Sequence, residues 1–176
     1  MGYKIEEKIL QRIKNVPKAL REIKDGFEKK KIPYKYYSLA FFLAYTGARI
    51  SEALSLTWDD IDLKNQTCLL PQLKKKRKIK REIPLHPKLC SILNMSTNKN
   101  GKVFDMTRQS AFLFFSKYKT SPHAFRHFFA IELLKRRIDF ESIRRLLGHE
   151  GYDVLKEYLN LSLDDLREKI NQLEIW

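Results

Sequence analysis

The sequence has few of the features that mark secreted or membrane-spanning proteins. Its only two cysteines, Cys68 and Cys90, lie in no metal-like spacing, and we expect both to be reduced. No apolar run approaches the ~20 residues that a membrane span needs. The first residues also lack the apolar core of a signal peptide. We therefore expect no membrane association and a cytoplasmic location.

Linkers are missing as well. No internal repeat, Gly/Ser-rich linker or low-complexity stretch divides the 176 residues, which are enough to bury a core of ordinary size. We therefore expect residues 1–176 to form a single domain.

Acidic residues are scarce relative to basic ones. The chain has 21 Asp and Glu against 35 Lys and Arg, a formal net charge of +14. This balance favours a polyanionic partner, with nucleic acid first and an anionic membrane surface second. Excess lysine can also serve solubility or thermal adaptation. Because no segment shows the basic amphipathic helix face that a membrane surface would require, nucleic acid is the favoured partner.

Apolar spacing predicts a mostly helical chain. Residues 4–29 fit two helices broken near Pro17, and residues 36–45 fit a buried helix that ends at Gly47 in a left-handed conformation. The fold class expected is α+β, mostly α, with a small antiparallel β-sheet formed by residues 67–73 and 81–85 around a basic turn. Further helices are expected at 50–56, 87–93, Thr107 or Ser110 to Tyr118, Ser121 to Arg136, Asp139 to Gly148, 155–158 and from Ser162 onward.

Polar residues of unusual type gather in the C-terminal third. His123 and Arg126 are three apart at a helix start, so they share a face beside N–H groups that suit a phosphate. A capping or core role for His123 is the alternative. The pair His123 and His127 has zinc-compatible spacing, but Ala124 stands where a general base would be needed and no third ligand is near. We expect no metal.

A second arginine lies far upstream, inside an apolar region. Arg49 precedes Glu52 by three residues, which also fits a surface ion pair on one helical turn. Because apolar residues bracket Arg49, we expect a fixed head group, with Glu52 orienting it as a supporting carboxylate.

Together these residues resemble the catalytic domain of the tyrosine recombinases, the phage-integrase superfamily. The match is carried by TGARISEAL (46–54), REIPL (81–85), SPHAFRH (121–127), LLGH (146–149) and a tyrosine nine residues further on. The resemblance implies a site-specific DNA recombinase that cleaves and rejoins strands through a 3′-phosphotyrosyl intermediate, with no cofactor. It assigns the catalytic roles to Tyr158, Arg49, His123, Arg126, His149 and a lysine of the hairpin.

The hairpin lysine is open between two positions. Counting back from Pro84 along the family's pattern points to Lys76, whereas counting forward from Asp60 points to Lys74. We prefer Lys74, because the other charges then lie in a longer turn. The remaining basic residues of the hairpin are expected to bind DNA phosphates: Lys75, Arg77, Lys78, Lys80 and Arg81.

Tyr45 and Tyr152 compete weakly with Tyr158 as nucleophile.

The family usually carries an N-terminal helical domain that closes around DNA, and we expect that domain to be absent here. The resemblance implies double-stranded DNA as partner, action at the nucleoid in a prokaryote, and a homotetramer on paired sites from a monomer or weak oligomer. An apolar stripe at residues 163–173 is expected to dock on its own domain or on a neighbouring protomer. Type IB topoisomerase-like nicking and religation, or a non-catalytic DNA-binding regulator, are the alternative functions.

Overall fold

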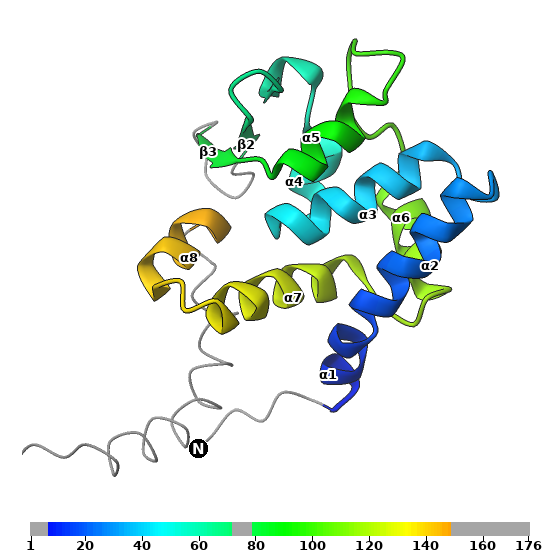
Figure 1. The fold of residues 1–176 in the computed structure, drawn as a ribbon, viewed down its shortest axis with the longest axis vertical. Helices are drawn as coiled ribbons and strands as arrows, with labels where there is room; N and C mark the ends of the chain where they lie inside the picture. The colour runs from blue at the N-terminus through cyan, green and yellow to red at the C-terminus, as the bar shows by residue number, and fades with distance from the viewer. Residues whose placement is uncertain (1–6, 72–78, 149–176) are drawn as a thin grey trace, which may run out of the picture.

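The computed structural model describes residues 7–71 and 79–148 (Figure 1). Within them, helices make up most of the fold and a small sheet lies at one side. The elements follow the order α1 (Glu7–Lys14), α2 (Val16–Glu28), α3 (Tyr34–Thr46), α4 (Ile50–Ser55), η1 (Trp58–Asp60), β1 (Ile61–Asp62), β2 (Thr67–Pro71), β3 (Lys80–Pro84), α5 (Pro87–Asn94), α6 (Arg108–Ser116), α7 (Pro122–Lys135) and α8 (Phe140–Leu147). None of these helices is long and apolar enough to cross a membrane.

Local signals set most helix boundaries. The first two helices are separate, and Pro17 lies in the first turn of α2, where a missing N–H costs nothing. Side-chain oxygens of Thr107, Ser121 and Asp139 accept hydrogen bonds from the first turns of α6, α7 and α8. These caps agree with the expected helix starts.

The sheet is antiparallel, in the order β1-β2-β3. Cys68 of β2 pairs with Ile83 of β3, and Leu70 pairs with Arg81. Side chains alternate along β3, so that Arg81 and Ile83 are buried while Lys80 and Glu82 are exposed. The expected mostly helical α+β fold is confirmed; β1 and η1, which are too short to give a sequence pattern, were not expected.

The core surrounds α3. Leu39, Ala40, Phe42 and Leu43 of this helix have no exposed surface. In Figure 1, α3 lies between α5 and the sheet on one side and α7 on the other, while α8 lies beside the far end of α7. This packing brings the end of α3, the start of α4, β3, the first half of α7 and the end of α8 to one place, which is where the candidate site forms.

Candidate active site

The site begins at the turn after α3, which ends at Thr46. Gly47 has φ = 61°, in the left-handed region. A Cβ added there would lie 2.5 Å from Phe129 Cδ1 and 2.8 Å from Leu147 Cδ2. Both the backbone conformation and the close approach of α7 and α8 therefore require glycine, and the turn delivers Arg49 to the start of α4.

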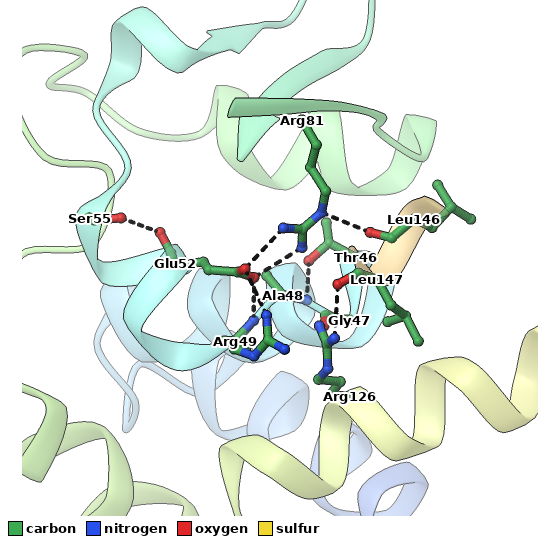
Figure 2. Close-up of polar contacts among 10 residues, drawn as sticks. All are labelled: Thr46, Gly47, Ala48, Arg49, Glu52, Ser55, Arg81, Arg126, Leu146 and Leu147. Atoms are coloured by element: carbon green, nitrogen blue, oxygen red, sulfur yellow. Dashed lines mark hydrogen bonds and ion pairs between the residues drawn. The ribbon is translucent and has the colours of Figure 1, made fainter. Parts of the chain in front are cut away.

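Arg49 is held at two points by the same carboxylate. Its backbone N–H donates to Glu52 Oε2 at 2.9 Å, and its Nη1 donates to Glu52 Oε1 at 3.2 Å (Figure 2). The first bond is one half of a helix capping box. The Arg49 side chain keeps 28% of its surface exposed. The guanidinium therefore has a fixed direction at the protein surface.

Glu52 is almost fully buried, with 1% of its side chain exposed. It also accepts two hydrogen bonds from Arg81, from Nη1 to Oε1 at 2.9 Å and from Nη2 to Oε2 at 3.0 Å. Burial raises the pKa of this carboxyl, but the hydrogen bonds and charge of Arg81, the Arg49 backbone and the charge of Arg126 outweigh it and hold the pKa below its ordinary value. Glu52 therefore stays ionised between two arginines.

Arg81 corrects an expectation, because it does not lie on a DNA-facing surface. Its side chain is 8% exposed and its guanidinium forms a bidentate pair with Glu52. Its Nε donates to the carbonyl oxygen of Leu146 at 3.0 Å. The sequence carried a signal for this placement, since Arg81 has the same strand parity as the apolar residues Ile83 and Leu85.

Arg126 is buried as well, with 1% of its surface exposed. Its Nη1 donates to the carbonyl oxygen of Gly47 and its Nη2 to that of Leu147, both at 2.8 Å. Leu147 is the last residue of α8, where backbone carbonyls lack helical partners and carry partial negative charge. Figure 2 shows how Arg81 and Arg126 reach the consecutive carbonyls of Leu146 and Leu147 from opposite sides.

The histidines at the start of α7 differ in exposure. His123 is exposed, and its pKa is lowered by partial desolvation and then by the charges of Arg126 and Arg49. The imidazole is therefore neutral at pH 7 and able to accept a proton. His127 is buried, and the two rings meet edge-on with centroids 4.5 Å apart. Among residues 7–71 and 79–148, no group of three His, Cys, Asp or Glu side chains could hold a metal ion.

Lys80, which is expected among the DNA contacts, has an acidic partner within the protein. Its Nζ forms an ion pair with Asp60 Oδ1, and its side chain is half exposed. Burial raises the pKa of Asp60, but the hydrogen bonds from Lys80 and Thr57 hold it below its ordinary value. In this arrangement Lys80 ties β3 to η1.

Several predicted residues lie outside the described residues. They are the basic residues of the turn and three residues that follow α8 in the sequence: Lys74, Lys75, Lys76, Arg77, Lys78, His149, Tyr152 and Tyr158. The competing Tyr45 is described. Its ring stacks on His86 with centroids 4.7 Å apart, on the side of α3 that faces a cavity lined by α7.

The described part of the site therefore brings together two of the predicted arginines and one predicted histidine. Arg126 donates to the carbonyl of Gly47, two residues before Arg49. The charges of both arginines lower the pKa of His123. Guanidinium groups match the geometry of phosphate oxygens, and a neutral imidazole can take up a proton. The chemistry that this arrangement suits is stabilisation of a phosphoryl group beside a proton acceptor.

Solved structures with the same fold include a recombinase and an integrase bound to DNA. A XerA recombinase aligns with 98% of this chain and 65% of its own, with 21% identity and a TM-score of 0.63. The Tn1549 transposon integrase in complex with circular intermediate DNA aligns with 90% of this chain and 66% of its own, with 19% identity and a TM-score of 0.68. The fold is that of the tyrosine-recombinase catalytic domain.

Sequence comparison leads to the family. The model of the phage integrase family matches residues 11–164, and the chain belongs to this family. It is 26% identical over 155 residues to the TnP I resolvase of Bacillus thuringiensis, covering 78% of this chain and 54% of that protein. It is 30% identical over 131 residues to the tyrosine recombinase XerA of Saccharolobus solfataricus, covering 70% and 45%. The chain thus spans about half the length of these relatives.

Proposed function

We propose that this chain is a site-specific DNA recombinase that cleaves and rejoins strands through a 3′-phosphotyrosyl intermediate. The observation that carries the proposal is the cluster of Arg49, at the start of α4, with His123 and Arg126 of α7, two segments joined by the buried hydrogen bond from Arg126 to the carbonyl of Gly47. Family membership and DNA-bound structures with this fold support it. Nothing in the described part of the site favours topoisomerase-like religation or a purely regulatory role.

In the proposed reaction, the Tyr158 oxygen attacks the scissile phosphorus and the bond to the 5′-oxygen breaks. His123 accepts the phenolic proton, and Lys74, or Lys76 in its place, supplies a proton to the leaving oxygen. Arg49, at the surface, stabilises charge on the non-bridging oxygens, Arg126 adds its positive charge from a buried position, and His149 donates a hydrogen bond to the phosphate. The 5′-hydroxyl of a partner strand then attacks phosphorus and releases tyrosine, so bond energy is conserved without a nucleotide cofactor.

DNA affinity is proposed to depend on the basic turn. Three of its residues, Lys75, Arg77 and Lys78, remain our candidates for contacts to backbone phosphates. Arg81 no longer belongs with them, and Lys80 is tied to Asp60. Sequence-independent contacts of this kind position a duplex, whereas they do not select a target.

The activity can be tested with a nicked DNA substrate that traps the intermediate. A target duplex would first be selected by binding from a randomised pool, and a nick beside the scissile phosphate would let the short fragment leave after cleavage. We expect a covalent protein–DNA adduct that survives denaturation and forms equally well in EDTA, since the proposed chemistry uses no metal. Absence of adduct on every selected duplex, or loss in EDTA with rescue by zinc or magnesium, would contradict the proposal.

A cavity on this domain supports a proposal about assembly. It measures about 750 Å³ and is lined mainly by side chains of α3 and α7, among them Phe41, Tyr45, Phe128 and Leu133. The sequence from 163 to 173 carries an apolar stripe that could fill such a cavity. We propose that this segment of one protomer occupies the cavity of the next, closing a tetramer on paired DNA sites.

Truncation after Asn160 tests this assembly. We expect the truncated protein to keep its melting temperature and its binding to one site, because the occupant belongs to another protomer, but to lose higher-order complexes on paired sites in sedimentation. Leu166→Ser with Ile170→Ser should behave in the same way, whereas Glu168→Ser, off the stripe, should assemble normally. An unfolded truncated protein would place the segment on its own domain, and normal assembly would exclude the segment from the interface.

A further inference from the structure

Arg81 contacts two separate parts of the site, the start of α4 and the end of α8. Its three donor nitrogens are each engaged: Nη1 and Nη2 with the Glu52 carboxylate, and Nε with the carbonyl of Leu146. The planar guanidinium is the side chain that can donate in these directions at once. One buried residue of the sheet therefore joins the start of α4 to the end of α8.

The connection continues at both ends. On one side, the Glu52 carboxylate also accepts hydrogen bonds from the backbone N–H and Nη1 of Arg49. On the other side, α8 stops at Leu147, and Gly148 follows with φ = 82°. A Cβ on Gly148 would lie 3.3 Å from Arg81 Nη1 and 3.5 Å from Arg81 Cζ, so Gly148 lies close against the guanidinium.

We propose that Arg81 is a positioning residue for strand cleavage, which couples the direction of Arg49 to the placement of the α8 end. Its effect reaches the reaction through two neighbours, since Arg49 is the phosphate-binding group and Gly148 directly precedes His149 in the sequence. Arg81 itself does not touch DNA. This inference rests on the proposed function for its kinetic consequences, but the coupling itself is a property of the folded domain.

Two substitutions separate the coupling from the charge. Arg81→Lys keeps a positive charge near Glu52 but cannot donate to Glu52 and Leu146 in one plane, and Arg81→Met keeps the volume without any donor. Glu82→Ala, on the exposed side of the same strand, is the matched control. We expect the adduct rate at saturating DNA to fall by roughly tenfold to a hundredfold in Arg81→Lys, the size of effect that misplacement by about 1 Å produces, and further in Arg81→Met.

DNA affinity should change little in both variants, because the lost bonds lie inside the protein. The pH profile gives a second readout. Glu52 loses its main partner in Arg81→Met, so its pKa rises and the adduct rate should fall as the pH is lowered through that pKa. Adding Glu52→Gln should remove this pH dependence. A residue that served stability alone would change neither the adduct rate of the folded protein at saturating DNA nor the dependence of that rate on pH.

Hydrogen exchange of the free protein provides a readout that does not depend on activity. We expect faster amide exchange in Arg81→Lys at residues 50–55 and 143–148, with residues 87–94 unchanged. A wild-type protein that forms no adduct would defeat the proposed function, and the exchange data would still decide the role of Arg81. The inference is overturned if Arg81→Lys exchanges like the wild type in both segments, if it forms adduct within about twofold of the wild-type rate, far short of the loss that misplacement causes, or if its loss of activity lies entirely in DNA affinity.

Discussion

Replacing Tyr158 by phenylalanine is expected to abolish the covalent adduct while DNA affinity stays nearly unchanged. The substitution removes the only atom that could bond to phosphorus and keeps the ring. A single hydroxyl contributes on the order of 1 kcal/mol to binding, so the loss of chemistry should far exceed any loss of affinity. Adduct formation on denaturing gels and binding by fluorescence anisotropy, on the same nicked duplex, measure the two effects separately.

The other tyrosines supply the controls. Tyr45→Phe keeps the ring that stacks on His86, and Tyr152→Phe removes the competing hydroxyl nearest to Tyr158 in the sequence. Both variants should form adduct at the wild-type rate. If Tyr158→Phe still forms adduct and Tyr152→Phe does not, the nucleophile is Tyr152.

Replacing Arg49 by alanine should slow adduct formation by about two to three orders of magnitude, the usual effect of losing one donor to a transition state. The melting temperature should change little, because the Arg49 head group lies at the surface and Glu52 keeps its bidentate pair with Arg81. Single-turnover rates and thermal unfolding measure the two quantities. Activity within about threefold of wild type, well below the effect of one lost donor, would remove Arg49 from the site.

Substitutions of Arg126 and Arg144 are the comparisons for Arg49→Ala. Arg144→Ala breaks an exposed ion pair with Glu141, also three residues apart, and should leave the rate unchanged. Arg126→Ala should lose activity and stability together, because it leaves the carbonyls of Gly47 and Leu147 without their buried donor. The contrast between Arg49 and Arg126 separates a residue that acts at the surface from one that also holds the fold.

Local features of the fold could be predicted from the sequence because their causes are local. The break before Pro17, the left-handed Gly47 and the caps at Thr107, Ser121 and Asp139 each depend on one residue and its immediate neighbours. The two main strands followed from alternation and a turn between them. Their observed ends differ by one or two residues, as helix and strand ends commonly do.

The bonds inside the site could not be predicted in this way. Charge composition placed Arg81 and Lys80 among the DNA contacts, since seven positive charges occur within residues 74–81. The partners that the structure gives them, Glu52 for Arg81 and Asp60 for Lys80, are 29 and 20 residues away. Strand parity was the one local signal that separated Arg81 from its basic neighbours, whereas the burial of Arg126 depends on carbonyls that no side-chain pattern reveals.

The spacing of these bonds has a consequence for the order in which the chain is made. The Glu52–Arg81, Arg81–Leu146 and Arg126–Gly47 bonds join positions 29, 65 and 79 residues apart. A chain synthesised from its N-terminus presents Arg49 and Glu52 early, but Arg81, which holds the Glu52 carboxylate, arrives only with β3. The carbonyls of α8 that bond to Arg81 and Arg126 arrive later still. A nascent or broken chain that ends before β3 therefore carries Arg49 without the buried arginine that fixes its carboxylate partner.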